Sequence, residues 1–396
     1  MDSEARLQRA EEHIFSTALL DSGARLGLAN MCYGLAKIHW VQEQMGLPAN
    51  ATYVAAPDCT VTRNRTRWRS GFGYGGILTW GEGDQDLIIL DSKPNACGMI
   101  VGGLDEVPPM KDLIKRVHEL GHDNVEIDGV PIEWDFGLSN HFIDLFRIEP
   151  LVDVDLPPYA FMMHFAGDEL RGETSFGPGL YWDKSPALRE RMRLFDTPFG
   201  PLRVLTRDDA RGYYEFYQKV ESFVHKRRLY AADRLFDTYE LINNDTHQGL
   251  TNPNQLLLGC YSFTDSNRLY AIGLRPDLPA YLVRGKPSLS QETIENLGFE
   301  KRAQRLEVYD RLTSANVLPH GGGYAYPDIL GVADVYQIDG ERYFEVDFAN
   351  GRGRQVISAV RDLPYEYRGR KVVLRAVELG LAELVARLMP EYILKV

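Results

Sequence analysis

The chain has 396 residues, of which 44% are hydrophobic and 25% charged, and its formal net charge is −12. This length is enough for one large core with insertions or for two average domains, and the composition is that of a globular enzyme. Because non-specific nucleic-acid binding rests on many phosphate contacts, so negative a charge argues against a protein coated in nucleic acid. The net charge does not exclude a local basic groove.

Several classes of protein are disfavoured by the apolar runs and the cysteines. No apolar run approaches the length of a membrane span, and the acidic start "MDSEARLQRAEEH" lacks the basic and apolar regions of a signal peptide. The four cysteines are scattered, with no CxxC pair, so reduced thiols fit better than a disulfide framework. We therefore expect a cytoplasmic protein without a membrane partner.

In chain order, helical periodicity over residues 4–46 ends at Gly46 and Pro48. Short apolar runs bounded by turns predict strands at 86–90, 159–165, 269–274, 342–348 and 371–377. Further helices are predicted at 108–120, at about 208–243, at 288–298 with a capping box of Ser288 and Gln291, and at 376–389. Strands and helices mix without regular alternation. We predict one α+β domain over residues 1–396, with mixed sheets flanked by helices and the helices of 4–46 packed on the core.

Two clusters of basic residues are candidates for a local nucleic-acid groove. The first is "RNRTRWRSGFGYGG", in which Arg63, Arg65, Arg67 and Arg69 alternate with other residues around Trp68. The second is "VHKRRLY", which contains Lys226, Arg227 and Arg228. For each cluster taken alone, a solvated charged loop is an equally good interpretation.

One cysteine and several histidines stand at the ends of predicted strands or at the starts of loops. They are Cys97 in "KPNACGMIVGG", His141 in "GLSNHFIDLF", His164 in "YAFMMHFAG" and His247 in "INNDTHQGL". A thiolate with several imidazoles is the ligand set of a transition-metal site assembled from distant segments. The alternative is a set of core or surface histidines with ordinary hydrogen-bond partners.

Near the end of the sequence, "NVLPHGGGYAYPD" places His320 directly before Gly321, Gly322 and Gly323. Glycines expose backbone N–H groups on which phosphate oxygens can rest, and side chains there would obstruct such an approach. A surface turn beside a solvated histidine is the simpler interpretation of this stretch.

A competing motif occurs in "VHELGHD", where His118, Glu119 and His122 form the HExxH pattern of zinc peptidases. Its setting does not suit a peptidase, because Gly121 falls where the amphipathic helix is expected to stop. No later helix offers an obvious third ligand. The alternative is a helix C-terminus with two histidines beside the helix dipole.

Apart from the HExxH motif, the short motifs of this chain resemble those of the RtcB family of GTP-dependent RNA ligases, and they occur in the same order. The resemblance runs from about residue 56 to 396. The matching elements are Pro57 and Asp58 before the glycines of Gly71 to Gly76, "PNACGM" around Cys97, Asn140 with His141, Phe142 and Asp144, the lone His164 and His247, "HGGGY" at His320, and Lys395 near the end.

The resemblance implies an enzyme that joins an RNA 3′-phosphate or 2′,3′-cyclic phosphate to a 5′-hydroxyl through a histidine–GMP intermediate. His320 would be the nucleophile. The implied metal ligands are Cys97, His141, His164 and His247, with manganese as the family metal and zinc also suited to sulfur and nitrogen donors. The implied GTP contacts are Asn140, Phe142, Asp144, Gly321, Gly322, Gly323 and Lys395, of which Asp144 and Lys395 would read the guanine edge. RNA ends and GTP are the implied partners.

Three positions depart from the family pattern. The family's metal-binding aspartate is Pro94 here, which suggests one ion rather than two unless Asp91 or Asn95 substitutes. The arginine that closes the family's glycine loop is Tyr324, and the family glutamate is shortened to Asp144. The second hypothesis is therefore a diverged relative that hydrolyses, or only binds, phosphate ends or nucleotide.

Overall fold

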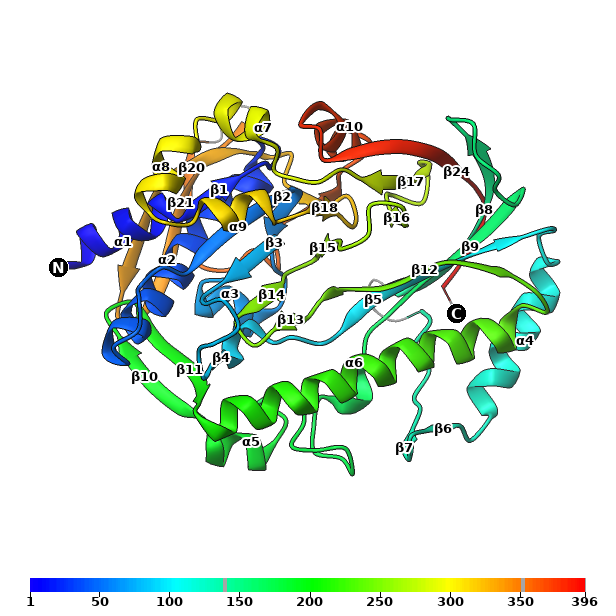
Figure 1. Ribbon diagram of the computed structural model, residues 1–396, viewed down its shortest axis with the longest axis horizontal. Helices are drawn as coiled ribbons and strands as arrows, with labels where there is room; N and C mark the ends of the chain where they lie inside the picture. The colour runs from blue at the N-terminus through cyan, green and yellow to red at the C-terminus, as the bar shows by residue number, and fades with distance from the viewer. Residues whose placement is uncertain (138–140, 350–352, 396) are drawn as a thin grey trace.

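Helices and strands in several sheets make up the computed structural model, which describes residues 1–137, 141–349 and 353–395 and confirms the α+β class (Figure 1). None of the described helices is long and apolar enough to cross a membrane. The helices in these ranges are α1 (Ser3–Glu12), α2 (Ser22–Gln44), α3 (Arg65–Ser70), α4 (Met110–His122), α5 (Pro186–Arg191), α6 (Asp208–Leu235), α7 (Gln291–Asn296), α8 (Glu300–Arg305), α9 (Tyr309–Thr313) and α10 (Lys371–Glu378), with short 3₁₀ turns at Leu90–Ser92 and Asp168–Leu170.

The largest sheet has seven strands, and all of its pairings are antiparallel. In spatial order they are β12 (Glu240–Gln248), β5 (Cys97–Leu104), β9 (Tyr159–Phe165), β8 (Phe142–Pro150), β24 (Ala382–Leu394), β17 (Ala280–Gly285) and β16 (Leu269–Ile272). The register sets His164 opposite both Met99 and Phe142, and Gln248 opposite Cys97. Segments far apart in the sequence therefore meet at one end of this sheet.

A second sheet has five strands and is mixed, since β1 runs parallel to β2 while the other pairs are antiparallel. Its strands are β1 (Ile14–Ser16), β2 (Thr52–Val61), β3 (Gly73–Thr79), β14 (Gln255–Leu257) and β13 (Leu250–Asn252). Every residue of β2 is buried. A carboxylate in this strand, Asp58, is thus held inside the protein.

The remaining strands form smaller sheets around these two. They are β10 (Arg193–Thr197), β11 (Gly200–Thr206) and β4 (Leu87–Ile89); β20 (Ile329–Ile338), β21 (Glu341–Phe348) and β22 (Arg354–Ile357); and the pairs β15 (Cys260–Ser262) with β18 (Val317–Pro319), β19 (Tyr324–Ala325) with β23 (Glu366–Tyr367), and β6 (Glu126–Ile127) with β7 (Val130–Pro131). Strand β18 leads directly into His320.

The N-terminal helix α2 is buried along most of its length and contributes Leu35, Ile38 and Val41 to the core. It approaches neighbouring backbone closely: a Cβ on Gly34 would lie 2.5 Å from the carbonyl oxygen of Gly71. Only glycine avoids this collision, because real Cβ atoms do not come so near. The other long helix, α6, runs along the lower side of the molecule in Figure 1.

Two element predictions near the C-terminus are wrong. Residues 371–377 form the helix α10 rather than a strand, and most of 376–389 belongs to the strand β24 rather than to a helix. In α10 the buried Val372, Val373 and Ala376 lie on one helical face, a pattern that a short apolar run does not distinguish from a strand. In β24, pairing with β8 on one side and β17 on the other overrides the helix-forming residues.

Smaller corrections concern helix ends. The long helix ends at Leu235 rather than near 243, because residues from Glu240 onward pair with β5. The N-cap of α7 is Ser290, which accepts a hydrogen bond from the N–H of Thr293, and not Ser288. The helix that carries the HExxH motif continues through Gly121 to His122.

The single-domain organisation of residues 1–396 stays a prediction, and limited proteolysis tests it. The core cluster that contains Leu35 of α2 also contains Ile143 of β8 and Leu394 of β24, so apolar contacts join early and late parts of the chain. We expect dilute protease to trim ends or loops and to leave one large resistant fragment. Release of two separately stable halves would contradict the prediction.

Candidate metal centre and nucleotide cavity

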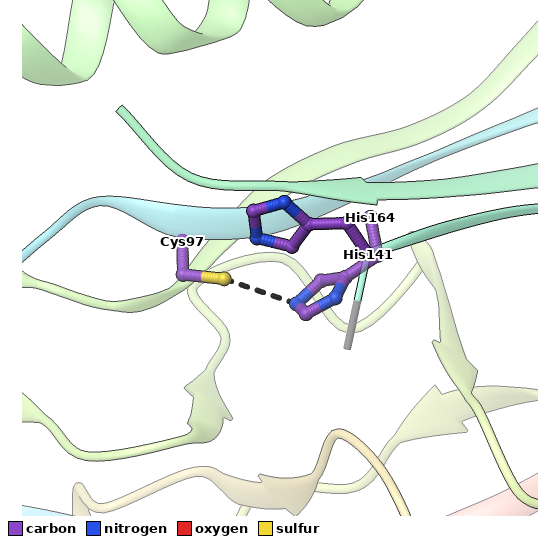
Figure 2. A group of neighbouring side chains, drawn as sticks. All are labelled: Cys97, His141 and His164. Atoms are coloured by element: carbon purple, nitrogen blue, oxygen red, sulfur yellow. Dashed lines mark hydrogen bonds between the residues drawn. The ribbon is translucent and has the colours of Figure 1, made fainter. Parts of the chain in front are cut away.

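A buried cluster of one thiol and three imidazoles lies where β5, β9 and β12 meet and β8 begins; Figure 2 shows three of its members, Cys97, His141 and His164. The Sγ atom of Cys97 is 3.0 Å from Nε2 of His164, and that nitrogen is 3.2 Å from Nε2 of His247. The ligand atoms of Cys97, His141 and His164 all lie within 4.8 Å of one another. Cys97, His141 and His164, which come from separate segments, are thus close enough to share one metal ion, and His247 lies beside them.

This group could hold a metal ion. Donors about 2.0–2.3 Å from one tetrahedral ion stand roughly 3.2–3.8 Å apart, close to the separations observed here. Soft sulfur with nitrogen donors suits zinc, whereas manganese prefers oxygen donors. Of the proposed substitutes for the residue at Pro94, Asp91 instead binds Trp182 and Arg203, and Asn95 accepts a hydrogen bond from the Cys97 backbone N–H.

The electrostatics of the cluster favour a thiolate. Burial acts to raise the pKa of the Cys97 thiol, but the rings of His164 and His247, with hydrogen bonds from His141 and His164, hold it well below its ordinary value. Burial and the neighbouring His320 ring lower the pKa of His247 to about 3, so this imidazole is neutral. A thiolate and a neutral imidazole are the ligand forms that metal binding requires.

Asp135 orients the fourth member of the cluster. Its Oδ2 atom lies 2.6 Å from Nδ1 of His141, which leaves Nε2 of that ring directed at Cys97. Burial would lower the pKa of His141, but the hydrogen bonds to Asp135 and Cys97 raise it to about 10. A metal ion entering the cluster would therefore displace the His141 proton. A carboxylate behind a ligating histidine is a common supporting contact at metal sites.

His320 stands beside this cluster, with its ring centroid 4.4 Å from that of His247. Its Nδ1 lies 2.8 Å from Oδ2 of Asp58, and the same oxygen accepts hydrogen bonds from the backbone N–H groups of His320 and Gly321. Because a carboxylate accepts, Nδ1 carries the proton and Nε2 keeps its lone pair. The ring is thus held in the tautomer that a nucleophile at Nε2 needs.

A cavity of about 150 Å³, the glycine-loop cavity, adjoins His320. Its lining includes the described nucleotide-binding candidates, which are Phe142, Asp144, Gly321, Gly322, Gly323 and Lys395, together with His164 and His320. Asn140 lies outside the described residues. Burial raises the pKa of Asp144 to about 7, although Lys395 acts to lower it, and the buried Oδ1 of Asp144 has no hydrogen-bond partner within the described structure.

The structure gives its own reason for two of the loop glycines. A Cβ on Gly322 would lie 2.4 Å from the carbonyl oxygen of Arg368. Gly323 has a φ of 66°, and a Cβ there would lie 2.5 Å from the carbonyl oxygen of Asp58. Close packing against backbone, in addition to any approach of phosphate, therefore requires glycine at these positions.

A larger cavity of about 660 Å³, the arginine groove, also borders the metal cluster. Cys97 and His141 line it, and Tyr74 and Tyr324 line both cavities. The arginines in its lining are Arg63, Arg65, Arg67, Arg171 and Arg361. Three of the four arginines of the first basic cluster therefore line this groove.

The second basic cluster does not line the groove as the sequence suggested. Arg227 and Arg228 are each 1% exposed, because Arg227 binds Asp135 and Glu169 inside the protein and Arg228 binds Asn244. Lys226 is paired with Asp128. Basic side chains on a helix that packs against a sheet can be buried in such internal pairs. A charge pattern in the sequence does not reveal this.

The HExxH motif shows no metal-binding arrangement. His118, Glu119 and His122 are exposed on α4, and Glu119 pairs with Lys115. Among the described residues, the one group of three or more potential ligands close enough to share a metal is Cys97 with His141 and His164. Nothing in the described structure therefore supports the peptidase hypothesis.

Sequence reasoning gave no role to two carboxylates, Asp58 and Asp135. Asp58 had a detectable signal, since it is a single charge within the apolar stretch "YVAAPDCTV" that forms β2. A buried charge needs a partner, and His320 is that partner. Asp135 had no such signal, because its contact with His141 depends on how the two segments fold together.

No protein-family model matches the chain, and no curated protein matches it. The class that the geometry defines is a protein with a buried thiolate–imidazole group able to hold a metal ion. Next to that group stands His320, which lines a cavity and whose Nδ1 is bound to Asp58. Any more particular function has to be argued from this arrangement.

Metal analysis tests the cluster. We expect Cys97→Ala to lose stoichiometric metal, and Asp135→Asn to bind metal about 10- to 100-fold more weakly because it frees the His141 ring. Cys32→Ser is the matched control, since Cys32 lies on α2 and donates to the carbonyl of Leu7 instead. Elemental analysis and zinc or manganese titration measure the effect. Full metal retention by Cys97→Ala would contradict the assignment.

Proposed function

We propose that the protein is an RNA-end ligase of the RtcB type, acting in the cytoplasm. It would join a 3′-phosphate, or a 2′,3′-cyclic phosphate after hydrolytic opening, to a 5′-hydroxyl with GTP as the energy source. The observation that carries the proposal is the placement of His320. Its Nδ1 is fixed by Asp58, and the residue borders a cavity that also holds Asp144 and Lys395, next to the metal-ligand cluster.

The proposed chemistry begins at Nε2 of His320. Its lone pair attacks the α-phosphorus of GTP, an N–P bond forms, and pyrophosphate leaves with the electrons of the broken P–O bond. Asp58 holds the Nδ1 proton and stabilises the positive ring as it develops. An oxygen of the RNA 3′-phosphate then displaces His320 from the GMP phosphorus. Finally the 5′-hydroxyl attacks the activated phosphate, loses its proton, and releases GMP.

Recognition of guanine is supported by two charged residues that line the cavity, the buried Asp144 and the exposed Lys395. The carboxylate of Asp144 can accept hydrogen bonds from the N1 and N2 groups of guanine, and its Oδ1 has no partner in the described structure to compete with them. Lys395 lines the same cavity and can donate to O6. Phe142 supplies an apolar ring on the cavity wall.

The cluster and the arginine groove complete the proposed machinery. A metal ion bound by Cys97 and the histidines would neutralise charge on the reacting phosphates. RNA phosphates would lie in the arginine groove, which opens on the same cluster. Where the family pattern has an arginine, this chain has Tyr324, but the guanidinium of Arg63 lies 5.8 Å from the centroid of the Tyr324 ring. A positive charge is therefore still available near the glycine loop.

The second candidate is a diverged relative that hydrolyses or only binds phosphate ends. Pro94 offers no donor atom, and Asp91 is occupied by Arg203 and Trp182. With neither residue in the described ligand group, the cluster suits one ion. If two ions are required for ligation, binding without ligation follows.

Covalent labelling tests the proposal. Incubation with α-labelled GTP and manganese or zinc, followed by denaturing electrophoresis, should label the wild type and leave His320→Ala unlabelled. Asp58→Asn should slow labelling on the order of 10²–10⁴-fold, because the amide no longer holds the productive tautomer. His118→Ala, an exposed histidine outside the site, is the control and should label normally.

Two outcomes would contradict the ligase. One is a wild type that binds GTP without ever becoming labelled, and the other is labelling that persists in His320→Ala. In the first case, equal affinity of wild type and His320→Ala for GTP would favour the diverged relative.

Guanosine binding should depend on pH through Asp144. Only the carboxylate accepts from both guanine N–H groups, and the pKa of Asp144 is about 7 because burial raises it against the opposing charge of Lys395. Affinity should therefore be full above pH 7 and fall as pH drops, by about tenfold per unit well below the pKa. Calorimetry with guanosine avoids titration of a ligand phosphate. Asp144→Asn should bind weakly at every pH, and a wild-type profile that is flat from pH 5.5 to 8 would contradict this role.

A further inference from the structure

A third cavity, of about 460 Å³, shares Arg65 of helix α3 with the arginine groove, but neither His320 nor any of the candidate metal ligands lines it. We call it the α3 cavity. Its walls come from α2, α3, β11 and the β20–β21 hairpin. The charged residues that line it are Lys37, Arg65, Arg69, Arg203, Glu341 and Arg342, so cations outnumber carboxylates by five to one.

The least expected of these residues is Lys37, which is 2% exposed. Its Nζ donates one hydrogen bond within the described structure, to the carbonyl of Pro201 at 3.3 Å. An ammonium group has three donors, and a buried charge is normally paired. No carboxylate among the described residues lies within ion-pair distance of Lys37. Its charge is therefore unmatched by the protein.

Two arginines add unmatched donors to the same space. Arg342 is 6% exposed; it donates to the carbonyl oxygens of Trp68 and Arg69, but its Nε has no partner among the described residues. Arg203 pairs with the buried Asp91 at 3.5 Å through Nη1 and stacks 4.0 Å from the ring centroid of Trp182, but its Nε has no partner in the described chain. The guanidinium of Arg203 stacks on Trp182 and that of Arg342 on Tyr33. In each case the Nε–H group has no hydrogen-bond partner in the described structure.

The carboxylates nearby are already engaged. Glu341 pairs with Arg69 at 3.4 Å, and the buried Asp91 accepts from Trp182 and from the backbone N–H of Arg203. The pKa of Lys37 is lowered to about 7, mainly by burial and also by the charges of Arg342 and Arg203. The charge of Asp91 acts in the opposite direction and raises this pKa. In a chain with a net charge of −12, this cavity is a local excess of positive charge.

We propose that the α3 cavity is a second anion-binding site, which takes a compact ligand carrying two or more linked phosphate groups. Guanidinium forks match pairs of phosphate oxygens, and an ammonium adds a point charge. The volume lies in the range of small-molecule sites. The site goes beyond the proposed ligase and does not depend on it, because it contains neither His320 nor a metal ligand.

Calorimetry with inorganic pyrophosphate, on metal-stripped protein in chelator-treated buffer, tests the proposal. Wild type should bind one equivalent at this site. Lys37→Met, which keeps the buried stem and removes the charge, should bind at least tenfold more weakly. Lys301→Met, the same change at an exposed position on α8, should bind as wild type does. Inorganic phosphate should bind at least tenfold more weakly than pyrophosphate, because it reaches fewer of the cations.

A second readout is proton uptake. At pH 8, titrations in buffers of different ionisation enthalpy should show more protons taken up by wild type than by Lys37→Met, since an anion beside Lys37 favours the charged ammonium. If Lys37→Met does not fold, Arg69→Gln at the exposed rim provides the comparison, with a loss of about threefold expected for one rim cation.

Three results would overturn the proposal. They are equal pyrophosphate affinity in wild type and in both Lys37→Met and Arg69→Gln, equal affinity of wild type for phosphate and pyrophosphate, and displacement of pyrophosphate by a single-stranded RNA lacking terminal phosphates. The last result would assign the cavity to an RNA backbone instead.

Discussion

One buried carboxylate oxygen, Oδ2 of Asp58, ties the glycine loop to the five-stranded sheet. It accepts from the His320 ring and from the backbone N–H groups of His320 and Gly321. Arg368 completes the connection, because it donates to the Asp58 carbonyl and to the carbonyl of Gly323 while its side chain pairs with Asp21. The position of the proposed nucleophile is thus set by strand β2, a fully buried element, rather than by the loop itself.

The metal cluster lies beside His320 and borders two cavities that differ in charge. The surrounding imidazoles lower the pKa of the Cys97 thiol and favour its thiolate, while burial and the neighbouring His320 lower the pKa of His247. The cluster borders both cavities: His164 lines the one with the buried carboxylate, and Cys97 and His141 line the groove with several arginines. Under the proposed function, guanine would occupy the first cavity and RNA phosphates the second, with candidate metal ligands in the walls of both.

Local patterns predicted a large part of this structure. The strand at 159–165 and the helix that became α4 were readable because apolar spacing and turns marked them. The predictions over residues 371–389 are wrong, since the pairing of β24 with β8 and β17 is set by long-range contacts. In the site, Cys97 and the histidines could be proposed from residue type at strand ends. Their convergence, and the support from Asp135, depend on register across a sheet and could not be derived from spacing.

The central claim is that Asp58 holds Nδ1 of His320 so that Nε2 performs the attack. Nuclear magnetic resonance on ¹⁵N-histidine-labelled protein after reaction with GTP reads this directly, because phosphorus couples to the ring nitrogen that carries it. The account predicts one phosphoramidate, on Nε2 of His320, with the Nδ1 proton still present. Phosphorus on Nδ1, on another residue, or on no protein nitrogen would contradict it.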